Sequence, residues 1–134
     1  MYLKLMNEEQ KSAFLEEAYI LAQIDGTYTA EEKAMLEAYA AEAELPLTQE
    51  MKEVTREQVK TKIRTLCGTR EHKIIIFELL GMALADADYS EKERETIEEL
   101  AETLGLGRDF SKACEEKISS YLRLQESINS LVLE

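Results

Sequence analysis

Apolar positions recur at spacings of three and four along nearly the whole chain, which is the pattern of helices that bury one face. Alternating or β-branched runs, which would indicate strands, are nearly missing. Capping boxes, in which Ser, Thr or Asn is followed three residues later by Glu or Gln, mark helix starts. They occur at Asn7–Gln10, Thr29–Glu32, Thr55–Gln58 and Ser90–Glu93. The pattern therefore predicts an all-α fold with six main helices and one short one.

Start and stop signals divide the chain into successive segments. We expect one repeat unit over about residues 8–45, connecting helices over 48–67, a second repeat unit over about 70–106 and a C-terminal helix over 109–131. Together, residues 1–134 should form a single-domain helical bundle. The residues expected to face its core are Phe14, Ala18, Leu21, Ala22, Leu36, Ala40, Ala43, Val59, Ile63, Leu66, Ile75, Leu79, Met82, Ala83, Ile97, Leu100, Ala101 and Leu104. A short turn capped by Thr48 should hold Met51 and Val54, and the last helix carries Cys114, Ile118, Tyr121, Leu122 and Ile128 on one side.

The sequence contains an internal repeat. Residues 15–45 align without a gap on residues 76–106, so that equivalent positions are 61 residues apart. The identical pairs are Glu17/Glu78, Ala22/Ala83, Asp25/Asp86, Tyr28/Tyr89, Glu32/Glu93, Glu37/Glu98, Ala40/Ala101 and Leu45/Leu106. Because the apolar register, the cap and the polar loop all agree, we expect two pseudo-symmetric helix-loop-helix units packed face to face.

Each repeat unit turns at an acidic loop. The loop reads Asp25-Gly-Thr-Tyr-Thr-Ala-Glu-Glu32 in the first unit and Asp86-Ala-Asp-Tyr-Ser-Glu-Lys-Glu93 in the second. A carboxylate after a helix C-terminus faces the negative end of the helix dipole, at a cost of about 0.3–1 kcal/mol, so a compensating partner is expected. One candidate is local: an Asx-type turn at each Asp, with each Glu completing its own capping box.

The other candidate partner is a divalent cation, Ca²⁺ or Mg²⁺, held by oxygen ligands from one or both loops. The second loop is the better host, because Asp88 stands where the first loop has Thr27. An EF-hand is rejected, since neither loop has the Gly at position six or the bidentate Glu at position twelve. The predicted metal ligands are Asp25, Glu32, Asp86, Asp88 and Glu93.

Other polar and aromatic residues have structural explanations. Tyr28 and Tyr89 precede the helix caps, where a ring can pack on the following helix. His72, the single histidine, falls in the first turn of a helix, where a solvated side chain is expected. The remaining carboxylates are expected on solvated helix faces, among them Glu8, Glu9, Glu16, Glu17 and Glu91.

Net charge, cysteine spacing and the N-terminal segment limit the classes of function that the chain can have. With 16 Lys and Arg against 28 Asp and Glu, the net charge of −12 repels a phosphate backbone and argues against nucleic-acid binding. Cys67 and Cys114 belong to no metal-ligand spacing and are expected to be two buried thiols of a reduced protein. The N-terminal segment lacks a signal-peptide pattern, and the apolar run over residues 74–85 is too short to span a bilayer. We therefore expect a cytoplasmic protein that does not insert into a membrane.

Motifs with a known catalytic mechanism are missing from the sequence, which has no GxSxG, Walker loop, GxGxxG or HExxH. We therefore expect a binding protein and not an enzyme. A metal-assisted hydrolase built on the Asp and Glu cluster ranks last, because it would also need an open coordination position and a substrate pocket.

Both loops carry a family resemblance, through Ala22-Gln-Ile-Asp25-Gly26 with Glu32, and through Leu84-Ala-Asp86 with Tyr89-Ser-Glu-Lys-Glu93, Ile97 and Leu104-Gly-Leu106. In these segments the sequence resembles the TerB family, a helical domain associated with tellurite resistance and also found in the N-terminal part of some membrane-anchored J-domain co-chaperones. The resemblance implies an all-helical fold with two related halves in a bacterial stress-response protein. It also implies that Asp25, Glu32, Asp86 and Glu93 chelate a metal or engage partners.

Two functions remain open. The first is a non-enzymatic binding module whose acidic loops hold a divalent cation or dock a partner protein. The second is a structural adaptor or dimerisation domain whose acidic loops are only capped turns. In that case an exposed apolar patch or the last helix would form the contact surface, and a homodimer is one outcome. Enough apolar residues for such a face are present at Tyr121, Leu124, Ile128, Leu131 and Val132.

Overall fold

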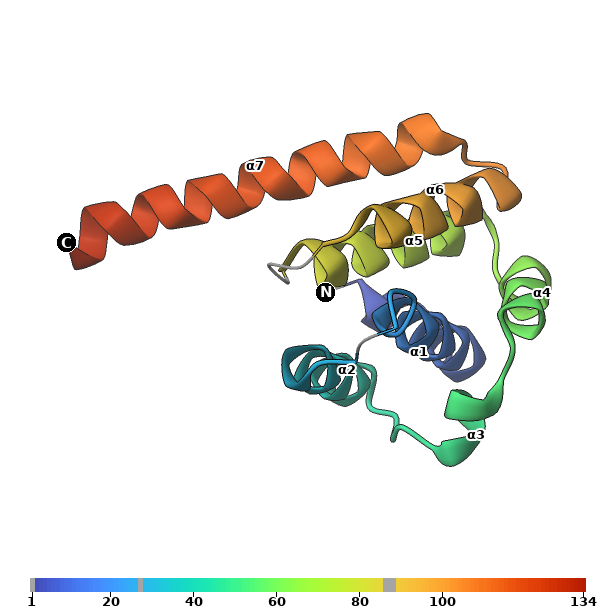
Figure 1. The fold of residues 1–134 in the computed structure, drawn as a ribbon. Helices are drawn as coiled ribbons and strands as arrows, with labels where there is room; N and C mark the ends of the chain where they lie inside the picture. The colour runs from blue at the N-terminus through green and yellow to red at the C-terminus, as the bar shows by residue number, and fades with distance from the viewer. Residues whose placement is uncertain (1, 27, 86–88) are drawn as a thin grey trace.

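The computed structural model describes residues 2–26, 28–85 and 89–134, and within them all regular secondary structure is helical. The elements are the short 3-10 turn η1 (Leu3–Leu5) and the helices α1 (Glu8–Ala22), α2 (Ala30–Ala43), α3 (Gln49–Glu53), α4 (Arg56–Leu66), α5 (Thr69–Ala85), α6 (Glu91–Thr103) and α7 (Arg108–Leu133) (Figure 1). The predicted all-α bundle of six main helices and one short one is confirmed. Only η1 was not predicted.

The helices pack in successive layers (Figure 1). Helices α5 and α6 contact each other in the middle of the bundle, and α7 packs against both of them. On the other side α1 contacts α5 and pairs with α2, while α4 and α3 cover a further side of α1. The two helical hairpins are therefore covered by different elements, α7 on one and α3 with α4 on the other.

Helix starts follow the sequence signals closely. In all four predicted capping boxes the N-cap oxygen accepts the backbone N–H three residues on, and that residue's side chain accepts the N-cap N–H. Thr48 caps the short α3 by accepting the N–H of Met51 at 3.3 Å. Local hydrogen bonds therefore determine where these helices begin.

The helices of the two repeat units begin at equivalent positions. Helices α1 and α5 begin at Glu8 and Thr69, which are 61 residues apart, and α2 and α6 begin at Ala30 and Glu91, again 61 apart. Both second helices end in the same turn. Its left-handed residue is Glu44 (φ 60°) in the first unit and the equivalent Gly105 (φ 81°) in the second. The repeated sequence thus forms two helical hairpins whose helices start, and whose second helices end, in equivalent ways.

Most residues predicted for the core are buried, including the equivalent pair Leu36 and Ile97 at 0% and 1% exposure. One prediction of burial is wrong, because Leu66 is 37% exposed. Tyr121 and Ile128 are 58% and 50% exposed, as the alternative of an apolar contact face on the last helix requires. Leu66 ends α4 at the rim of the bundle, and the other two lie on α7. Helical spacing identifies an apolar face, but not whether another element covers it.

Two carboxylates expected on solvated faces, Glu16 and Glu17, are instead buried, each at 3% exposure. The reason is that α1 is enclosed by α2, α3, α4 and α5, so a polar position on it still faces another helix. Both oxygens of Glu16 accept hydrogen bonds from the Lys62 ammonium of α4 at 3.0 Å. His72 is likewise half-buried, with its Nε2 3.1 Å from the carbonyl oxygen of Ile63.

Candidate functional site

The predicted acidic site lies at the turns that join α1 to α2 and α5 to α6. Asp25 follows α1, while Glu32 and Glu93 occupy the third positions of α2 and α6. Asp86 and Asp88 lie outside the described residues. Three of the five predicted ligands can therefore be placed, and both loops contribute to them.

Glu32 and Glu93 are held by their own helix caps. The Oε1 atom of Glu32 accepts the Thr29 N–H at 3.0 Å, and Oε1 of Glu93 accepts the Ser90 N–H at 3.0 Å and the Ser90 hydroxyl at 3.1 Å. Both Glu side chains are buried, at 9% and 4% exposure. The local interpretation of these residues as halves of capping boxes is thus confirmed. Capping also fixes their orientation at the helix N-termini.

The carboxylates of the two loops act on one another. The pKa of Glu93 is raised above its ordinary value, first by burial and then by the negative charges of Asp25 and Glu32, against the lowering effect of hydrogen bonds from Ser90. Asp25 and Glu32 belong to the first repeat unit, whereas Glu93 belongs to the second. The two units contact each other through α1 and α5, and the anionic groups of their loops lie within electrostatic reach of one another.

Among residues 2–26, 28–85 and 89–134, no three His, Cys, Asp or Glu side chains are arranged as a group that could hold a metal ion. Asp86 and Asp88, the residues that made the second loop the better predicted host, lie outside these ranges. The metal-ligand set therefore stays a prediction.

The tyrosines of the two loops pack differently. Tyr89 lies under the guanidinium of Arg94, which is 4.9 Å from the ring centroid and lies one turn into α6. Arg94 also bonds Glu115 of α7 at 2.8 Å, so the second loop is tied to α7 through this side chain. Tyr28 instead makes an edge contact with Tyr19 of α1 at 5.6 Å. Packing on the following helix is confirmed for Tyr89, whereas Tyr28 packs on the preceding one.

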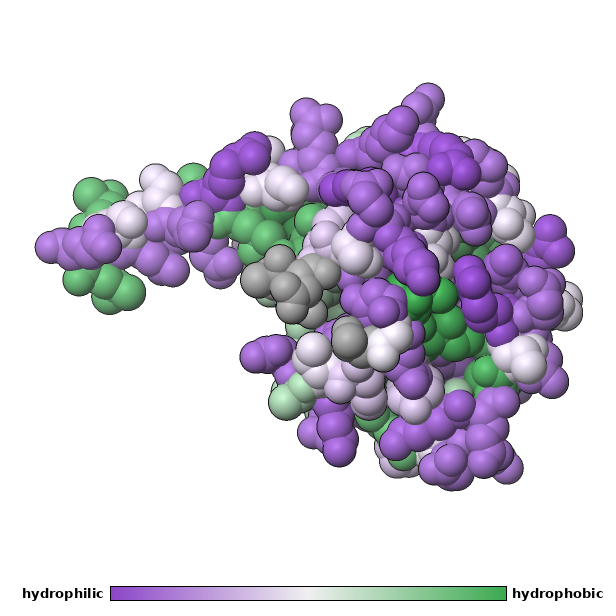
Figure 2. Space-filling view, in the orientation of Figure 1, coloured by the Kyte–Doolittle hydropathy of each residue, from purple (hydrophilic) through white to green (hydrophobic). Residues whose placement is uncertain are grey.

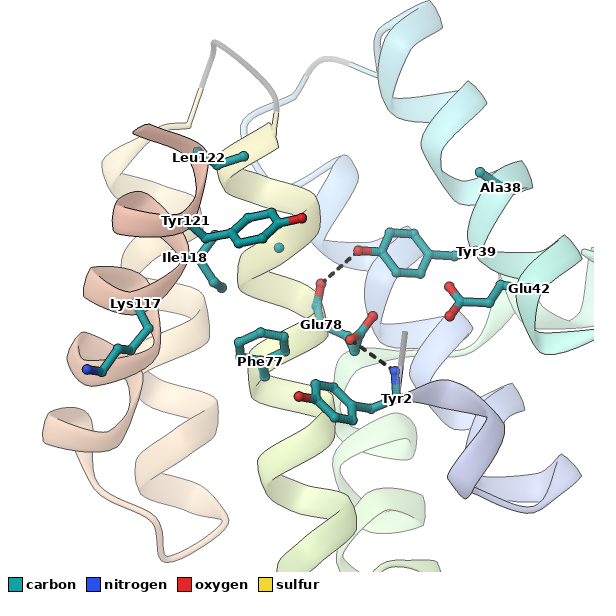
Figure 3. A pocket seen from close by; sticks show the side chains of 11 residues that line it. Tyr2, Ala38, Tyr39, Glu42, Phe77, Glu78, Lys117, Ile118, Tyr121 and Leu122 are labelled. Atoms are coloured by element: carbon teal, nitrogen blue, oxygen red, sulfur yellow. Dashed lines mark hydrogen bonds between the residues drawn. The ribbon is translucent and has the colours of Figure 1, made fainter. Parts of the chain in front are cut away.

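A groove of about 570 Å³ lies between α2, α5 and α7, and the sequence did not predict it. Aromatic rings of Tyr2, Tyr39, Phe77 and Tyr121 surround it (Figure 3). The carboxylate of Glu78 accepts a hydrogen bond from the Tyr2 N–H at 3.4 Å. The backbone carbonyl oxygen of Glu78 accepts one from the Tyr39 hydroxyl at 3.3 Å. Since the rings come from four separate segments, no local spacing could have grouped them.

The two cysteines are poor nucleophiles. Burial raises the pKa of Cys67 to about 11, with a further contribution from the charge of Glu71, and burial also raises the pKa of Cys114. Both thiols are 8% exposed and free of a disulfide. They stay protonated at neutral pH, as expected of structural thiols.

The chain was also compared with known proteins. No family model, curated protein or solved structure matches it. The TerB resemblance and the residue roles that it implies therefore stay predictions, while the description of the fold depends on the structure alone. Among the helices that the structure describes, none has the length and apolar character needed to cross a bilayer.

Proposed function

We propose that the chain is a non-enzymatic binding module of the TerB type, acting in a bacterial stress response, whose two acidic loops together bind a divalent cation or a cationic partner protein. The observation that supports this proposal most is the effect of Asp25 and Glu32 on the pKa of Glu93. Repulsion between the exposed carboxylate of Asp25 and the buried carboxylates of Glu32 and Glu93 opposes their ionisation, and a bound positive charge would relieve that repulsion.

The capping bonds leave room for this role. Among the described contacts, Glu32 and Glu93 use only Oε1 for their caps, so Oε2 of each remains to meet a further positive charge. Ca²⁺ and Mg²⁺ prefer such carboxylate oxygens, and Ca²⁺ accepts six to eight oxygen ligands in flexible geometry. Asp86 and Asp88 would add ligands from the second loop, consistent with the family resemblance.

Charge and capping can be separated by experiment, because the chain itself shows that Gln can cap. Gln10 and Gln58 accept the N-cap N–H in α1 and α4 at 3.0 and 2.9 Å, in the same way as Glu32 and Glu93 do in α2 and α6. Glu32→Gln and Glu93→Gln therefore remove a negative charge and keep the cap. Glu57→Gln, at an 86% exposed side chain in the first turn of α4, is the matched control.

The test is a calorimetric titration with Ca²⁺ and Mg²⁺, combined with thermal melts of the full chain. Cation at ten times its Kd should stabilise the wild type by about 1.4 kcal/mol, which raises Tm by about 3–5 °C. Glu93→Gln and Glu32→Gln should lose most of this shift, while Glu57→Gln should keep it. A wild type that shows no heat and no shift at millimolar cation overturns the cation form of the proposal, as does an undiminished shift in Glu93→Gln.

A further inference from the structure

The outer half of α7 extends beyond the other helices. Ser111, Cys114 and Ile118 of its first half are buried at 1%, 8% and 8% exposure. Past them the helix continues to Leu133 and projects from the body, with hydrophobic side chains at its tip (Figures 1 and 2). We call the exposed apolar residues along one side of this outer half the α7 stripe, which leaves out Leu133, about 120° around the helix from Tyr121. They are Tyr121, Leu124, Ile128, Leu131 and Val132, with exposures of 58%, 60%, 50%, 83% and 70%.

An uncovered stripe of this size needs a partner. Isolated helices shorter than about 12–15 residues are marginal in water, and most helical stability comes from packing an apolar face. Contiguous exposed apolar residues mark association surfaces in soluble proteins. The packed first half of α7 nucleates the helix, and a surface that covers the stripe would add the packing that residues 122–133 lack.

Charge indicates which partner fits. The whole chain has a net charge of −12, yet residues 118–133 contain only Arg123 and Glu126 as charged residues and are neutral in sum. At 3.6 residues per turn, both lie roughly 140–160° around the helix from Tyr121 and thus face away from the stripe. A neutral, apolar face has nothing to select a basic partner. A second copy of the chain presents an equally neutral face, so the net charge of −12 on each copy is kept off the contact itself.

We propose that two copies of this chain associate through antiparallel packing of their α7 stripes. Tyr121, Leu124, Ile128 and Leu131 follow the three-four spacing of a coiled-coil seam. In an antiparallel pair with two-fold symmetry, Tyr121 meets Leu131 of the second copy, and Leu124 meets Ile128 of the second copy. Each contact then occurs twice, as an isologous interface requires.

The flanks of the seam agree with this register. Gln125 lies opposite Gln125 of the second copy, and Ser127 opposite Ser127, so no like charges meet beside the apolar layers. Ile118 lies beside Val132 of the second copy, which extends the apolar contact at both ends. The sequence is therefore complementary to itself on this face.

The groove next to α7 supplies the rest of the contact. It is lined by Ile118 and Tyr121 of α7 together with Phe77 of α5 and Tyr39 of α2 (Figure 3). In the antiparallel register the last turn of the second copy reaches Ile118 and Tyr121, and so enters the groove. Stable interfaces bury about 800 Å² on each partner, and the groove adds apolar area to the helix pair. The inference is independent of the proposed cation site, since it uses neither Glu32 nor Glu93.

The oligomeric state of the full chain is the first test, measured by light scattering and sedimentation equilibrium. We expect a dimer for the wild type and a monomer for Ile128→Glu, which places charge at the centre of the stripe. Ser130→Glu adds the same charge on the opposite side of α7 and should remain dimeric. Far-ultraviolet circular dichroism and a cooperative melt verify that both variants fold. A wild type that is monomeric up to the sub-millimolar range overturns the inference, as does a dimer that Ile128→Glu leaves intact.

Cross-linking tests the antiparallel register. Gln125→Cys lies next to the two-fold axis and should form a disulfide with the same introduced cysteine of the second copy. Ser130→Cys should form no such disulfide. Tyr121→Cys should cross-link to Leu131→Cys in a mixture of the two variants, but not to itself. The native thiols are buried, and the wild type controls for them. Efficient self-cross-linking of Tyr121→Cys would indicate a parallel pair and would overturn the proposed register.

Discussion

The two repeat units differ in what covers them, although they share one local structure. Each unit has the same capping box, the same loop position and the same left-handed turn after its second helix. The first unit packs under α3 and α4, whereas the second packs under the long α7. Local hydrogen bonds therefore determine where the helices of each unit begin, while the covering elements determine the surroundings of its polar side chains.

The equivalent residues Glu17 and Glu78 show this difference most clearly. Both are buried, at 3% and 4% exposure. Glu17 has its Oε2 atom buried without a hydrogen-bond partner among the described residues, and burial raises its pKa to about 7 against the opposing charges of Arg56 and Lys60. Glu78, in contrast, accepts the N–H of Tyr2 beside the groove. The equivalent carboxylate thus lowers stability when it is ionised in the first unit, whereas in the second unit it holds the N-terminal segment through a hydrogen bond.

The largest effects are expected when an equivalent core side chain is truncated in each unit. Leu36→Ala and Ile97→Ala affect equivalent positions that are 0% and 1% exposed, so each should lower the free energy of unfolding by about 2–5 kcal/mol. Urea denaturation followed by circular dichroism should show one transition in both variants, because α1 packs on α5 and joins the two units. Two separate transitions in either variant would contradict a shared core.

Replacing the two buried carboxylates should have opposite effects. The raised pKa of Glu17 means that its protonated form suits the fold; its contribution to stability is complete below pH 4.5 and is lost as pH rises through about 7. Glu17→Met should therefore stabilise the protein by about 3 kcal/mol at pH 8 and by less than about 1 kcal/mol at pH 5. Urea midpoints at the two pH values measure this difference.

Glu78→Met is the matched control for that experiment. It removes the acceptor of the Tyr2 N–H, so it should destabilise the protein at both pH values. A gain from Glu17→Met that does not change with pH would show that packing, and not the titration of Glu17, is responsible.

The smallest expected effect concerns the turn that ends each unit. Glu44 adopts a left-handed conformation with φ 60°, where the equivalent residue of the second unit is Gly105. Glu44→Gly should therefore stabilise the protein by up to about 1 kcal/mol, since Gly adopts this conformation without a steric penalty. Gly105→Ala should destabilise it by a similar amount. Thermal melts of the two variants measure the difference, and a loss of stability in Glu44→Gly would contradict the equivalence of the turns.

The sequence predicted those features that neighbouring residues determine. Thr29 and Ser90 bond groups three residues away, so the helix starts could be read from the order of residues alone. The burial of Glu17 and the exposure of Ile128 could not be derived in this way, because they depend on which helix lies alongside. The effect of Asp25 and Glu32 on the pKa of Glu93 agrees with the expectation, drawn from the repeat, that the two acidic loops lie near each other.

The buried thiols make the motion of the two covers measurable. Cys67 directly follows α4, which covers the first unit, and Cys114 lies within α7, which covers the second. Because each thiol is shielded and protonated at neutral pH, an alkylating reagent can modify it only during a transient opening of its own cover. The two modification rates, resolved by mass spectrometry, would show whether the covers detach independently or only when the whole chain unfolds.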